Sequence, residues 1–95
     1  LHEYGHGVST RLTGGPANSS SLDALQSGGM GEGWSDFFAL MFQQRPGDTA
    51  NGSYGVGTYV KGHTRTGGGL RVEPYSYDMT VNPHTFADFE LNSAN

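Results

Sequence analysis

The residues with the clearest chemical potential are two histidines four positions apart, with a glutamate directly after the first, in the pattern H-E-x-x-H at positions 2 to 6. On an α-helix, residues four apart lie on one face, with about 5–6 Å between their Cβ atoms. Two imidazoles at that spacing can bind one zinc ion at roughly 2.0–2.1 Å each. Successive residues are rotated by about 100°, so Glu3 points away from His2 and His6 and can face a metal-bound water. The pattern predicts two ligands and one general base.

A catalytic zinc site of this kind needs a third protein ligand and leaves a further position for water. The segment G-G-M-G-E-G-W-S-D-F at positions 28 to 37 supplies the carboxylate of Glu32. Asp36 follows four residues later, where it can accept the N–H of a ligand imidazole and fix the tautomer. An alternative is that both acids merely occupy the first turn of a helix, where the macrodipole favours negative charge. We expect His2, His6 and Glu32 to be the ligands.

These two motifs closely resemble those of the fungalysin family, secreted zinc metallopeptidases related to the thermolysin-like enzymes, whose third ligand is a glutamate on a second helix. Similar blocks continue at 11–15, 45–49, 74–79 and 81–83, so the resemblance covers nearly the whole chain. It implies an α+β, zincin-type domain in which two zinc-binding helices precede a loop-rich, irregular segment. It also implies one Zn²⁺ per subunit, secretion, extracellular protein substrates and an inhibitory propeptide in the precursor.

The expected reaction is hydrolysis of peptide bonds by a zinc-activated water. Bound zinc lowers the pKa of that water to about 7 and polarises the scissile carbonyl. Glu3 takes the proton and passes it to the leaving amine. By analogy with thermolysin-like enzymes, Asp36 orients His2. Those enzymes carry N-E-x-x-S-D, whereas Gly31 stands at the Asn position here, and no oxyanion-stabilising His or Tyr is identified in the sequence.

Two alternatives from other classes stay open. One is a zinc-binding or structural glycoprotein without turnover, although a structural site needs no base such as Glu3. Another is a zinc hydrolase acting on a non-peptide substrate. Two further zinc patterns are excluded by spacing: the metzincin motif needs glycine and histidine where Ser9 and Leu12 stand, and the inverted H-x-x-E-H pattern does not occur.

Length and composition indicate a part of a larger catalytic domain. The chain has 95 residues, of which 16 are glycine and none is cysteine, and only 34% are hydrophobic. Such a composition builds a weak core without staples. His2 also lies almost at the start of the chain, where little precedes it to hold a helix. We therefore expect residues 1–95 to be an internal piece, incomplete at both ends and inactive alone.

The net charge of −4 argues against nucleic-acid binding, and no apolar run approaches the ~20 residues of a membrane helix. The sequons at Asn18 and Asn51 permit N-glycosylation in a secreted protein. His63 and His84 are weaker candidates for extra ligands or transition-state donors. Oxygen groups near Asp78 could hold calcium, but no EF-hand-like spacing supports such a site.

The elements that must position these groups are two helices. The first is expected from residue 1 to about 13, ending at Gly14-Gly15-Pro16 with a left-handed glycine. Val8 and Leu12 should face the core, another backbone could approach Gly5 or Gly7 closely, and Arg11 is interpreted as a surface or ion-paired residue.

After an irregular connection through residue 27, a second helix is expected from 32 to about 44. Its broad apolar face should pack into the core, and consists of Trp34, Phe37, Phe38, Met41 and Phe42. Weak strand candidates follow at 54–60 and 70–72.

Overall fold

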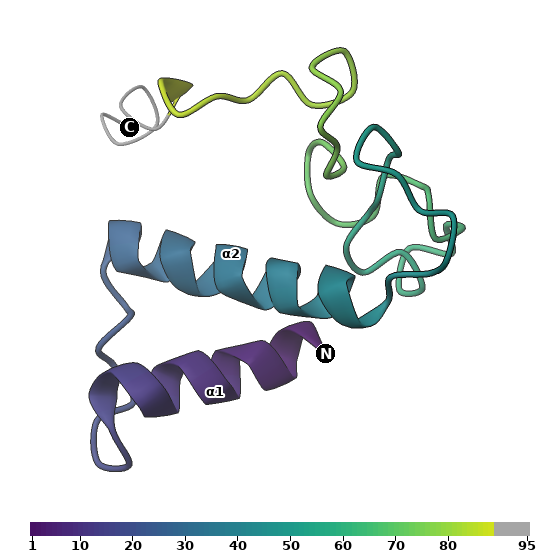
Figure 1. Cartoon of the computed structure of the whole chain (residues 1–95). Helices are drawn as coiled ribbons and strands as arrows, with labels where there is room; N and C mark the ends of the chain where they lie inside the picture. Colours follow the sequence, from purple (N-terminus) through teal and green to yellow (C-terminus); the bar gives the residue numbers. More distant parts are fainter. Residues whose placement is uncertain (89–95) are drawn as a thin grey trace. The chain divides into compact units, whose positions relative to one another are not determined.

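The computed structural model describes residues 1–88 of the chain. It divides into two compact units, one from Leu1 to Gln43 and one that begins at Gln44. The first unit holds both helices, labelled α1 and α2 in Figure 1. The described part of the second unit consists of turns and loops.

Helix α1 extends over His2–Gly14, which confirms the first predicted helix. The helix ends because Gly15 adopts φ 77° and ψ −177°, and its N–H still donates to the Arg11 carbonyl oxygen at 2.9 Å. A glycine with positive φ was expected here, but this ψ is extended rather than left-handed helical. The chain therefore leaves the helix in an extended direction towards Pro16, which lacks the N–H needed to continue it.

Helix α2 extends over Leu25–Phe42 and begins seven residues before the predicted start at Glu32. The predicted irregular connection through Ser27 is therefore wrong for residues 25–27, which are helical. The glycine-rich segment at 28–33 is helical as well. Glycine weakens a helix by about 1 kcal/mol relative to alanine, but here α2 packs along α1. The first turn of α2 contains no acidic residue, so the macrodipole interpretation of Glu32 and Asp36 is also wrong.

Small residues are buried in the two helices, and Gly5 and Ser35 form their close contact. Gly5 of α1 is buried, as are Gly31, Ser35 and Ala39 of α2. A Cβ atom added to Gly5 would lie only 2.9 Å from the Cα atom of Ser35, which confirms the expected close approach at this glycine. The Ser35 hydroxyl donates to the Gly31 carbonyl oxygen at 2.8 Å within α2, so this buried polar group is satisfied.

The predicted aromatic core is wrong for most of its members. Phe37 is 67% exposed and Leu12 of α1 is 81% exposed, with Trp34, Met41, Phe42 and Val8 exposed as well. Only Phe38 is partly buried, with its ring 6.0 Å from Tyr4 and 4.7 Å from Phe42, centroid to centroid. The reason is that α2 turns its small-residue face towards α1, which leaves its large apolar residues outside that contact.

The second unit contains two isolated β-bridges among its described residues, in place of the strands predicted at 54–60 and 70–72. One pairs Tyr54 with Tyr75 and the other pairs Val56 with Gly69. Glycines at 55 and 57 interrupt the first segment, and three glycines at 67–69 directly precede the second; glycine weakens strand interiors. Within residues 1–88 the named elements are therefore the two helices, and the α+β class expected for the whole domain is not confirmed. Val56 is buried in the second unit.

An ion pair closes one loop of the second unit. The Arg65 guanidinium contacts both carboxylate oxygens of Asp48, at 2.6 and 2.9 Å, and lies over the Tyr54 ring at 5.6 Å. The Tyr54 hydroxyl accepts from the Thr49 N–H at 2.9 Å.

Within residues 1–88, neither helix has the length and apolar character needed to cross a membrane.

Candidate metal centre

Three potential ligands meet between the two helices. The donor atoms of His2, His6 and Glu32 all lie within 4.8 Å of one another. The two imidazole Nε2 atoms are 2.9 Å apart. Each Nε2 lies 3.2 Å from a different oxygen of the Glu32 carboxylate. Two nitrogen donors and one carboxylate therefore face a common point.

Helix geometry accounts for this convergence. The histidines lie four apart on α1, and their rings meet edge to face at a centroid distance of 4.6 Å and an interplanar angle of 78°. Close packing of Gly5 against Ser35 brings α2 near α1, and Glu32 lies one turn before Ser35 on α2. The side chain of Glu32 is half exposed, so the centre opens towards solvent.

Asp36 supports the centre from its buried side. Its Oδ1 lies 2.7 Å from Nδ1 of His2, and its side chain is only 1% exposed. The Nδ1 atom of His2 is itself buried and has no hydrogen-bond partner of good geometry, so its short contact with Asp36 is an ion-pair contact. A carboxylate at Nδ1 favours the tautomer that leaves Nε2 as the donor towards the shared point. Asp36 therefore lies behind the cluster rather than within it.

The donor set fits a divalent transition-metal ion. Catalytic zinc sites use three protein ligands drawn from imidazole and carboxylate and leave a position for water. Imidazole nitrogen is a borderline ligand that suits zinc better than magnesium or calcium, which prefer oxygen. Two imidazoles, one carboxylate and a partly exposed opening match a catalytic zinc site. That a metal binds here, and that it is zinc, stays a prediction.

Glu3 is exposed on α1, next to His2 in the chain, and is separate from the three-residue cluster. His63 and His84 are also outside it. The Nδ1 atom of His63 accepts from the Gly69 N–H at 3.1 Å. Nε2 of His84 lies 2.9 Å from a carboxylate oxygen of Glu73, which raises the pKa of His84.

The two sequons lie on exposed turns, and Asn18 and Asn51 are both exposed. The side-chain oxygen of Asn18 accepts from the Ser20 N–H at 3.1 Å, which shapes the turn after α1. Asp78 accepts from the N–H and hydroxyl of Thr80, at 2.9 and 2.7 Å, and these bonds lower the pKa of its carboxyl. The Asp78 contacts make a local turn and do not test calcium binding.

The model for fungalysin metallopeptidases, peptidase family M36, matches residues 1–95. The chain belongs to this family, whose members have a zincin-like fold. The extracellular metalloproteinase 4 of Arthroderma otae is 53% identical over 88 residues, which are 93% of this chain and 13% of that protein. Extracellular metalloproteinase 1 of Phaeosphaeria nodorum is 50% identical over 88 residues, 93% of this chain and 14% of the relative.

Extracellular metalloproteinase MEP of Neosartorya fischeri is 50% identical over 95 residues, which are 100% of this chain and 14% of that protein. The chain thus spans about one seventh of the length of these relatives. The names of the relatives describe extracellular metalloproteinases, and family membership implies a bound metal.

Proposed function

We propose that this chain carries the metal-binding and proton-transfer residues of a secreted zinc endopeptidase. Residues 1–95 would then form part of one catalytic domain of the α+β, zincin type, incomplete at both ends, with α1 and α2 as its zinc-binding helices. The observation that carries the proposal is the convergence of His2, His6 and Glu32, whose donor atoms lie within 4.8 Å of one another. The family and the names of the relatives support peptide bonds of extracellular proteins as the substrate.

The ligands would be Nε2 of His2, Nε2 of His6 and the Glu32 carboxylate. When bound, zinc supplies a Lewis acid that activates water and polarises the scissile carbonyl. Asp36 would accept the Nδ1–H of His2 and so keep the lone pair of that ring on Nε2, and the 2.7 Å contact between Oδ1 and Nδ1 supports this role. The negative charge of Glu32 offsets part of the charge of a dication, and its exposure leaves room for substrate on the same side.

Glu3 would move the proton. Its carboxylate takes the proton from the attacking water and then gives it to the leaving amine. Its position fits because it lies on α1 directly after His2, yet remains exposed and outside the ligand cluster. A base that also bound the metal would lose its lone pair to the ion. The group that stabilises the oxyanion would be a residue other than these five.

The remaining features of the proposal come from the family. Secretion and an extracellular site of action are supported by the names of the relatives. An inhibitory propeptide and N-glycans at Asn18 and Asn51 are part of the proposal, and the exposure of both asparagines is compatible with glycans. The acidic net charge is a reason not to propose nucleic acid as a partner.

The test is a Glu3→Gln variant of the full-length protein, assayed on casein with and without a chelator. It should keep the metal content of the wild type by elemental analysis and lose turnover by at least a factor of about 10². Asp23→Asn removes an exposed acid of the connection between α1 and α2 and serves as the matched control. A Glu3→Gln enzyme that keeps more than a tenth of its turnover would remove Glu3 from this role. A wild-type protein that leaves casein intact would overturn the peptidase assignment.

A further inference from the structure

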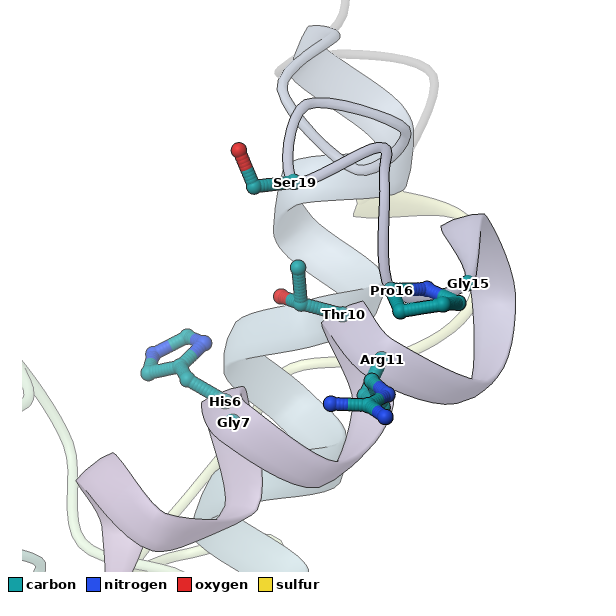
Figure 2. Close-up of a pocket in the computed structure, with 7 residues that line it drawn as sticks. All are labelled: His6, Gly7, Thr10, Arg11, Gly15, Pro16 and Ser19. Carbon is teal, nitrogen blue, oxygen red and sulfur yellow. The ribbon is translucent and has the colours of Figure 1, made fainter.

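A pocket of about 330 Å³ lies beside the metal centre, along the outer side of α1 (Figure 2). It is confined to the first unit, between the second half of α1 and the turn after it. His6 belongs both to this pocket and to the metal-ligand cluster. The lining residues are His6, Gly7, Thr10, Arg11, Gly15, Pro16 and Ser19.

Helix geometry places the pocket next to the proposed base. Gly7 comes four residues after Glu3, so the two share one face of α1, one turn apart. A substrate whose scissile bond lies over Glu3 and the ligand histidines would therefore have a neighbouring segment over Gly7. The pocket is a direct continuation of the metal centre along the helix.

The pocket exists because its floor lacks a side chain. A Cβ atom added to Gly7 would meet nothing within 4 Å, so the space above this glycine is open. Gly15 turns the chain with φ 77° and brings Pro16 and the loop after it to the far wall. Figure 2 shows the side chains of His6 and Thr10 extending from α1, with Ser19 on the loop beyond them.

The pocket carries the one lysine or arginine of its unit, Arg11. Arg11 is the only lysine or arginine in residues 1–43, whereas four acids, Glu3, Asp23, Glu32 and Asp36, occur in the same stretch. Arg11 is exposed. No carboxylate in the described part of the chain forms an ion pair with its guanidinium. Thr10 and Ser19 add hydroxyl groups to the same wall.

We propose that this pocket is a substrate subsite that binds a carboxylate, namely the side chain of an aspartate or glutamate in the peptide, through the Arg11 guanidinium. The inference rests on the proposed peptidase function and adds a specificity-determining residue to it. A guanidinium matches the planar carboxylate with paired hydrogen bonds that a lysine could not reproduce. The acids around the metal centre repel an acidic peptide. An aspartate or glutamate side chain of the peptide would therefore bind best next to Arg11.

The experiment measures peptide binding rather than cleavage, on the full-length protein carrying Glu3→Gln. The probes are fluorescent peptides that contain glutamate or glutamine at one position at a time, up to four residues on either side of the cut. Dissociation constants come from anisotropy, with zinc content and thermal midpoint measured for every variant. Arg11→Gln and Arg11→Glu are compared with Lys61→Gln, which removes an exposed cation outside the pocket.

At one position, glutamate should bind about tenfold more tightly than glutamine, and rising salt should shrink that ratio. Arg11→Gln should bring the ratio close to one, and Arg11→Glu should make a lysine peptide the preferred one, a gain that misfolding cannot produce. Lys61→Gln should keep the parent ratio. The lysine peptide is a third probe, with lysine at the same position as the glutamate. A parent without any preference for glutamate, or one whose preference survives Arg11→Gln, would overturn the subsite. Casein cleavage by the wild type is scored separately, so a failed subsite and a failed peptidase assignment remain distinguishable.

Discussion

Removing the carboxylate of Asp36 should weaken metal binding without removing a ligand. Asp36 Oδ1 lies 2.7 Å from Nδ1 of His2, and the side chain is 1% exposed. Loss of such a carboxylate behind a ligand histidine typically lowers metal affinity 10–100-fold. That range corresponds to about 1.4–2.8 kcal/mol. Asp36→Ala should reach the upper end, whereas Asp36→Asn keeps an acceptor oxygen and should stay near the lower end.

The measurement is the zinc dissociation constant of the full-length protein, by competition with a fluorescent chelator. Asp23→Asn is the matched control, since it removes an exposed acid of the same unit. Nitrogen chemical shifts of His2 report its tautomer and should show the Nδ1–H form in the wild type and a mixture in Asp36→Ala. A zinc affinity of Asp36→Ala within twofold of the wild type would refute the argument that Asp36 prepares His2 for the metal.

Two further predictions concern packing and pH. Gly5→Ala should lower the free energy of unfolding by about 1–3 kcal/mol, as overpacking does, because its Cβ would lie 2.9 Å from a backbone atom of α2. Gly7→Ala is the control, since a Cβ there has open space and should not lower the thermal midpoint. Equal effects of the two substitutions would contradict the close contact at Gly5. The Arg65 guanidinium lowers the pKa of Asp48 from 3.8 to about 2, so the stabilisation from this pair is present above pH 3.8 and is lost as the pH falls through about 2. An NMR titration should show the Asp48 pKa returning towards 3.8 in Arg65→Gln, and an unchanged value would exclude Arg65 as the cause.

Helical spacing was sufficient to anticipate which side chains share a helix face. His2 and His6 share a face because they lie four apart, and Glu32 and Asp36 share another for the same reason. Their meeting required the two helices to pack side by side, and the resemblance to a family supplied that step. The open space beside Arg11 was missed. Its signal was the position of this residue as the single lysine or arginine of the first 43.

The start of α2 and the direction of its apolar face were not predictable from local pattern. Glycines at 28, 29, 31 and 33 lower helix propensity, which favoured a loop before Glu32. In the structure those small residues lie within a helix that packs against α1, and close packing offsets their weak propensity. The spacing of Trp34 and Phe37 shows that an apolar face exists. It does not show which face meets α1, and the small Ser35, which lies against Gly5 of α1, allows the nearer approach.

All four side chains of the metal centre and its support come from one helical hairpin within residues 1–43. Contacts this local involve little loop-closure entropy, and helix pairs of low contact order are among the quickest units to form. During synthesis, the ligand set would therefore be complete soon after residue 43 emerges. Metal captured at that stage would add its binding energy to the nascent hairpin and give the later segments of the chain a preformed surface on which to assemble.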